Sequence, residues 1–190
     1  MQPTTYNAQR TTQLQPIIQK YGLDTAAVMA VVEVESSGVG FNPPTGKMII
    51  RFEPSWFRRL SKQANATLAE AWNTTPFSNQ NAQYIKYNNA FSIDPKAAMQ
   101  STSIGLMQVM GFHHAELGFD TVQAFWDFGK QSEDNQLELG LRFIKSIPAL
   151  YAALKDKNWA AFAYHYNGPL YRENNYDTRL LNAYNKHKQA

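Results

Sequence analysis

The chain has 190 residues, a formal net charge of +3 and no cysteine. The lack of cysteine excludes disulfides, thiolate zinc sites and a cysteine nucleophile. The length suits one compact core, so we predict a single domain over residues 1–190. The positive charge is small and contains no run of like charges, which predicts that nucleic acid is not a partner.

Helical spacing dominates the first part of the chain. Asp24 is suited to cap a helix that runs to about Val34, and this segment is apolar nearly all round, so we expect it to be buried. Three glycines and two prolines then predict a loop over residues 36–46. An earlier helix, ending at Gly22, is indicated by apolar residues three and four apart, namely Leu14, Ile17, Ile18 and Tyr21.

Residues 47–52 form the only strand that the sequence predicts, as half of a short hairpin. Asp94 and Pro95 supply a cap and a first turn for one later helix. No internal repeat or flexible linker interrupts the chain, so a mainly α domain with a small β element is expected. The other expected helices are 55–62, 80–91, 122–131, 133–147, 148–155, 159–166 and 177–186.

The N-terminal segment predicts synthesis in the cytoplasm. Residues 1–15 are polar and lack the basic start and apolar run of a secretory signal. The densest apolar stretch, residues 25–34, is too short to span a bilayer, so no stable membrane insertion is expected. A target outside the cell would then be reached by release or lysis.

Glu35 is the first candidate for chemistry. It stands on the last turn of a buried helix, just before a loop that contains Gly38. The negative end of the helix dipole and the loss of water both raise the pKa of a carboxyl group. A carboxylic acid that stays protonated is suited to protonate the leaving oxygen in glycoside cleavage. The alternative is an ordinary solvated glutamate at a helix end.

Two further segments contain polar side chains among apolar ones. Gln108 is surrounded by Leu and Met residues, so it is either a core amide bonded to backbone or a groove residue that binds sugar hydroxyls. In residues 162–169, aromatic residues end at a Gly-Pro stop. This segment is either a plain helix end or a place where Tyr166 and Asn167 face a sugar.

Taken in order, these segments resemble a known pattern. Glu-Ser ending a helix, Gly-Leu-Met-Gln opening another and Tyr-Asn-Gly near the C-terminus look like goose-type lysozymes and soluble lytic transglycosylases. The finer match, from about Tyr21 to Tyr184, resembles the N-acetylmuramidase family of phage and prophage endolysins. Its motifs are Val34-Glu35-Ser36, Arg51-Phe52-Glu53, the run from Ser103 to Phe112, the run from Asn158 to Ala163, Tyr166-Asn167-Gly168-Pro169 and Asn175-Tyr176-Asp177.

The resemblance implies a lysozyme-like, mainly α fold and hydrolysis of the β-1,4 bond between N-acetylmuramic acid and N-acetylglucosamine. It implies an endolysin that acts on cell-wall peptidoglycan, with Glu35 and not Glu33 as the catalytic acid. Residues two apart on a helix point in different directions, so only one of these two can face a given cleft. The residues expected to bind the glycan are Ser36, Ser103, Gln108, Tyr164, Tyr166 and Asn167.

The chain departs from the family pattern in three places. Relatives usually carry Arg-His where this chain has Pro54-Ser55, and often carry Trp at the position of Ile104. A stretch rich in Gly and Tyr is replaced by residues 65–83. These differences affect the expected shape of the cleft wall and leave the acid in place.

A second carboxylate is usual in glycoside cleavage, at roughly 5 Å from the acid for direct attack and roughly 6.5–9.5 Å when it positions water. Glu53, in the Phe-Glu motif, is the best candidate, and its alternative role is to hold the loop through backbone amides. His113, His114 and Glu116 do not have the spacing of a zinc site, so neither metal nor cofactor is expected.

Two other functions remain open from the sequence. A lytic transglycosylase would share the acid and form 1,6-anhydromuramyl products instead of admitting water. A non-catalytic peptidoglycan-binding protein would hold the glycan without cutting it. In every case we expect a monomer that lacks a separate wall-binding module.

Overall fold

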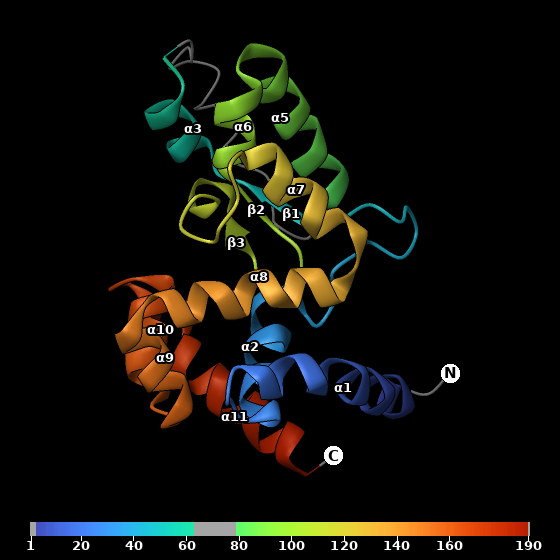
Figure 1. The fold of residues 1–190 in the computed structure, drawn as a ribbon, viewed down its shortest axis with the longest axis vertical. Coiled ribbons are helices and arrows are strands. Elements are labelled where there is room, and N and C mark those ends of the chain that lie inside the picture. Colours follow the sequence, from blue (N-terminus) through green and yellow to red (C-terminus); the bar gives the residue numbers. More distant parts are fainter. Residues whose placement is uncertain (1–2, 63–78, 190) are drawn as a thin grey trace. The chain divides into compact units, whose positions relative to one another are not determined.

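The computed structural model describes residues 3–62 and 79–189, which form two compact units (Figure 1). The first unit comprises Met1–Val39 and Gly140–Ala190, and the second comprises Gly40–Leu139. The fold is mainly helical with a small antiparallel sheet, as predicted. The prediction of one catalytic domain over residues 1–190 stays a prediction. Most of the segment that departs from the family pattern, residues 65–78, lies outside the described residues.

The first unit is built around helix α2, Thr25–Ser36, which packs against α1, α9 and α11 (Figure 1). Its residues 27–32 are buried, as its apolar composition predicts. The Asp24 side chain caps it by accepting a hydrogen bond from the Ala27 amide at 2.9 Å. The other elements of this unit are α1 (Pro3–Lys20), the end of α8 (Glu133–Ser146), α9 (Pro148–Lys155), α10 (Trp159–Asn167), η2 (Tyr171–Asn174) and α11 (Tyr176–Lys188).

Helix α2 ends two residues later than predicted, so the loop begins at Ser37. Ser37 adopts a left-handed conformation with φ of 55°, and its amide donates to the Val32 carbonyl. The buried Ser36 hydroxyl donates to the same carbonyl at 3.1 Å. These bonds satisfy the helix end and place Glu35 within the last turn.

The second unit contains a three-stranded antiparallel sheet in the order β1 (Ile50–Phe52), β2 (Thr102–Ile104) and β3 (Val109–Met110). Arg51 pairs with Ser103, and Ser103 pairs with Met110. The surrounding helices are α3 (Pro54–Leu60), α5 (Gln80–Ile93), α6 (Pro95–Gln100), η1 (Gly111–His113), α7 (Val122–Gln131) and the start of α8.

The sheet corrects two predictions. Residues 47–52 were expected to be the only strand, but β2 and β3 join β1. The Gly-Leu-Met-Gln motif was expected to open a helix, but it forms the turn between β2 and β3. The physical reason is that these strands have only three and two residues, and β2 is buried throughout, so neither shows the alternation that marks a strand.

Buried glutamines cover the outer edge of β1. Gln80 of α5 accepts from the Ile50 amide at 3.0 Å and donates to the Ile50 carbonyl at 3.1 Å. Gln83 accepts from the Phe52 amide at 3.1 Å. Side-chain amides thus satisfy the backbone groups of an edge strand. Across the described ranges, no helix is both long enough and apolar enough to cross a bilayer.

Candidate active site

Glu35 lies half-buried in the last turn of α2. Its Oε1 accepts a long hydrogen bond, 3.3 Å, from Nδ2 of Asn167, the last residue of α10. Gly168, with φ of 87°, ends α10 directly after Asn167. The fold therefore brings the Glu-Ser and Tyr-Asn-Gly motifs together although they are 132 residues apart.

Tyr166 comes directly before Asn167 on α10, and its phenol interacts electrostatically with Glu35. Its ring stacks on Phe162, with centroids 5.2 Å apart, and meets the Phe143 ring edge-on at 5.6 Å. Burial raises the pKa of the Tyr166 phenol well above its usual value of 10.0, and the charges of Glu35 and Tyr176 raise it further. The phenol is therefore neutral, and its hydroxyl group stays a hydrogen-bond donor at physiological pH.

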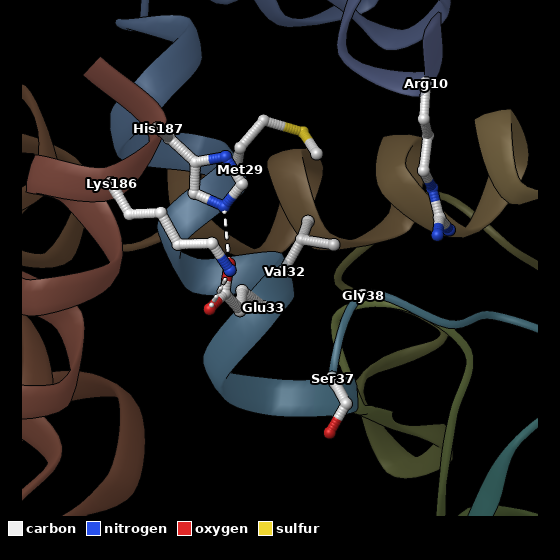
Figure 2. A pocket seen from close by; sticks show the side chains of 8 residues that line it. All are labelled: Arg10, Met29, Val32, Glu33, Ser37, Gly38, Lys186 and His187. Atoms are coloured by element: carbon white, nitrogen blue, oxygen red, sulfur yellow. Dashed lines mark hydrogen bonds and ion pairs between the residues drawn. The ribbon is translucent and has the colours of Figure 1, made fainter. Parts of the chain in front are cut away.

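Helix α11 holds the end of α2 in place. The Arg179 guanidinium donates to the Val34 carbonyl at 3.1 Å, which puts a cation at the negative end of the helix dipole. Figure 2 shows the Glu33 carboxylate facing Lys186 and His187, at 3.0 and 2.8 Å. These three residues help to line a hollow of about 300 Å³, and Glu35 is not part of its lining.

Glu53 occupies the N-cap position of α3, but its side chain does not cap the helix. Instead it pairs with Arg51, whose Nε lies 2.7 Å from Glu53 Oε1. The sequence left open that Glu53 holds the loop by accepting hydrogen bonds from backbone amides. Among the described residues, its side chain instead forms an ion pair with Arg51. Burial raises the pKa of Glu53 above 4.5, opposed by the charge and hydrogen bond of Arg51 and then by the charge of Lys86.

Lys86 is a buried lysine of α5, 7% exposed, whose charge acts on Glu53. Lys86→Met is expected to raise the pKa of Glu53 further, because it removes a cation that favours the carboxylate. The raised folded-state pKa means that the contribution of Glu53 to stability is complete below pH 4.5 and is lost as the pH rises through that pKa. In Lys86→Met this loss moves to higher pH.

The measurement for Lys86→Met is the ¹³C chemical shift of the Glu53 carboxyl group, followed across a pH titration. Lys130→Met, an exposed lysine on α7, is the matched control and should leave the titration unchanged. A Glu53 pKa that stays constant or falls in Lys86→Met would show that the lysine charge does not act on this carboxylate.

The β2–β3 turn presents Gln108 in a fixed orientation. Gln108 has φ of 48°, its Oε1 accepts from the Ser103 hydroxyl at 2.9 Å and its Nε2 donates to the Gly105 carbonyl at 2.7 Å. Each of these amide atoms keeps capacity for one more hydrogen bond. Gln108 is half-buried, so the local bonds orient the amide without burying it fully.

The buried side chain of Gln136, on α8, anchors this turn through a hydrogen bond to its backbone. It is 1% exposed; its Oε1 accepts from the Leu106 amide at 3.0 Å and its Nε2 donates to the Gly129 carbonyl at 3.0 Å. A Cβ atom at Gly105 would lie 2.6 Å from the Gln136 side chain, so the close approach requires glycine. The sequence analysis missed Gln136. The feature that could have indicated a buried glutamine is its position in the sequence next to Leu137 and Leu139, which are both buried.

The remaining predicted residues lie in different surroundings. The Ser36 hydroxyl is engaged inside α2, which favours a role in ending that helix. Tyr164 is exposed, with 52% of its surface open. His113 pairs with Glu116 at 2.9 Å, and the residues that the structure describes contain no group of three or more possible metal ligands.

Comparison with known proteins identifies the family. The sequence profile of N-acetylmuramidase matches residues 24–188. The chain belongs to the N-acetylmuramidase family. It is also similar to the crystal structure of the Burkholderia AP3 phage endolysin, with 38% identity and a TM-score of 0.78 over 95% of this chain and 71% of that one. No curated protein matches the chain.

Membership of the muramidase family confirms the main expectations from the sequence. The chain is a glycoside hydrolase of the muramidase type, its substrate is peptidoglycan, and it acts on the cell wall. The family match covers the segments that contain Glu35, Glu53, Gln108 and Asn167.

Proposed function

We propose that Glu35 is the general acid that cleaves the β-1,4 bond between N-acetylmuramic acid and N-acetylglucosamine. The observation that carries this proposal is the hydrogen bond from Asn167 Nδ2 to Glu35 Oε1 at the end of a buried helix. Partial burial disfavours a negative charge at this position, and Arg179 at the end of α2 opposes this effect by offsetting the negative end of the helix dipole. In its protonated form, this carboxyl group can donate a proton to the leaving sugar oxygen.

The hydrogen bond from Asn167 determines which oxygen of the Glu35 carboxyl group carries the acid proton. Because the Asn167 amide donates to Oε1, that oxygen acts as the acceptor and the acid proton resides on Oε2. Oε2 then delivers its proton to the glycosidic oxygen as the bond to the leaving sugar breaks. The neutral phenol of Tyr166 adds no competing negative charge beside the acid.

Glu53 supplies the second carboxylate in this proposal. It attacks the sugar as a nucleophile or positions the attacking water, and its ion pair with Arg51 keeps the carboxylate oriented. Gln108 and Asn167 bind sugar hydroxyl and amide groups, together with Tyr164 and Tyr166. Ser103 acts by orienting Gln108. The protein works as a monomer.

The test is mass spectrometry of the products formed in ¹⁸O-labelled water. Hydrolysis adds one water to each cut bond, so the new reducing muramic acid ends should carry one ¹⁸O and be two mass units heavier than in ordinary water. Lytic transglycosylation would give unlabelled anhydromuramyl ends that lack one water. Binding without either product would identify a non-catalytic protein and refute the proposal.

A further inference from the structure

Trp56 is an exposed aromatic residue next to Glu53. It lies three residues after Glu53, the N-cap residue of α3, so both residues belong to the start of this helix. The Trp56 amide donates to the Glu53 carbonyl at 3.1 Å, which fixes this spacing. The Trp56 side chain is 37% exposed, a large apolar surface to leave in water.

Two side chains extend the surface of Trp56. The Phe112 ring, from η1, lies 4.6 Å from the Trp56 ring at an angle of 42°. The Arg59 guanidinium lies 5.2 Å from the centre of the Trp56 ring. Trp56, Phe112 and Arg59 together are named here the Trp56 platform. It joins two segments that are far apart in the sequence and presents aromatic rings beside a positive charge.

We infer that the Trp56 platform binds the peptidoglycan glycan strand at a sugar away from the bond that is cut. The inference rests on the proposed function, in which Glu53 faces the substrate. The C–H face of a pyranose packs on an aromatic ring, and a guanidinium pairs with a carboxylate. N-acetylmuramic acid offers both, because its lactyl group bears a carboxylate or a peptide with acidic ends.

Charge complementarity selects this occupant. Arg58 and Arg59 are both exposed on α3, and the described residues give neither of them an acidic partner. A glycan that carries an acidic lactyl group or an acidic peptide on every second sugar matches a surface that combines a ring with exposed cations. Phe91 provides the contrast: it is 38% exposed and contacts Tyr87 at 5.7 Å, and within the described part of the chain no cation lies over its ring.

The experiment compares Trp56→Ala, Trp56→Phe, Arg59→Gln and the matched control Phe91→Ala in the full chain, with glycan strands of four and of at least ten sugars as substrates. Trp56→Ala is expected to raise KM about tenfold on long strands, the size of one lost aromatic contact, with kcat unchanged. Trp56→Phe should retain most of the affinity. Short strands and Phe91→Ala should behave like the wild type.

Binding assays separate the cation from the ring and the platform from the catalytic acid. In a Glu35→Gln background, Arg59→Gln should weaken binding to muramic acid-containing glycan and leave binding to neutral N-acetylglucosamine oligomers unchanged. Trp56→Ala should weaken binding to both. Sedimentation with insoluble peptidoglycan reports this binding without cleavage, so the result does not depend on which residue is the acid.

Three results would overturn the inference. The first is that Trp56→Ala handles long strands like the wild type or like Phe91→Ala. The second is an equal loss of kcat on strands of both lengths, which would indicate a general structural defect. The third is a Trp56→Ala variant that loses binding to vesicles containing phosphatidylglycerol but retains binding to glycan, because the platform would then face lipid.

Discussion

Replacing Glu35 with glutamine is expected to lower peptidoglycan cleavage by on the order of 10²–10⁴-fold, because an amide cannot protonate the leaving sugar oxygen. The fold should survive. The glutamine carbonyl oxygen can still accept the hydrogen bond that Asn167 donates to Glu35 Oε1. The measurement is the release of reducing ends from purified peptidoglycan, with thermal unfolding recorded on the same sample.

Glu33→Gln is the matched control, since it makes the same chemical change two residues earlier on the same helix. It removes the ion pair with Lys186, whose side chain is exposed, and changes the contact between Glu33 and the His187 ring. A pair of this kind contributes about 0–1 kcal/mol, so the expected effect is a small loss of stability with activity retained. Full activity in Glu35→Gln, or its loss in Glu33→Gln alone, would reassign the acid.

Most helices could be predicted from the sequence because their signals are local. The predicted ranges 122–131 and 148–155 coincide with α7 and α9. Asp94 caps α6 by accepting from the Ala97 amide at 3.0 Å, as its place before Pro95 predicts. A cap or a stripe of apolar residues acts within one turn or two, so it is visible in a short window of sequence.

The sheet could be predicted only in part because its strands are defined by partners far away. Residue 51 pairs with residue 103, and no local pattern marks that pairing. The same limit applies to the polar groups around the site. In the sequence, nothing distinguishes Lys86 from a lysine on a helix surface. The fold buries it, and its charge acts on Glu53. Burial and charge partners therefore needed the structure.

For the candidate site, the sequence identified the chemical groups but not their supports. Glu35 and Asn167 stand out from their motifs, and the fold places them in contact. The sequence left two interpretations of Gln108 open, a core amide or a sugar-binding residue. The structure gives it features of both, because its amide is bonded to Ser103 and to the Gly105 backbone and yet is only half-buried. The support from Gln136 depends on a contact 30 residues away.

Gln136→Met is expected to have the largest effect on stability. Methionine fills a similar volume but leaves the Leu106 amide and the Gly129 carbonyl without their hydrogen bonds in a buried region. An unsatisfied buried group costs about 1–3 kcal/mol, so the loss of two bonds should lower the free energy of unfolding by roughly 2–6 kcal/mol. Urea denaturation at constant pH measures this change, and the midpoint should move to lower urea concentration.

Gln123→Met on the exposed surface of α7 provides the control for that substitution. The Gln123 side chain is exposed and, among the described residues, donates a hydrogen bond to Asp127 alone, at 2.8 Å, so the free energy of unfolding should change by less than about 0.5 kcal/mol. Activity at low urea separates stability from positioning: folded Gln136→Met should bind glycan less tightly, because the turn that presents Gln108 has lost its anchor. Equal unfolding curves for the two variants would mean that the β2–β3 turn holds its shape without Gln136.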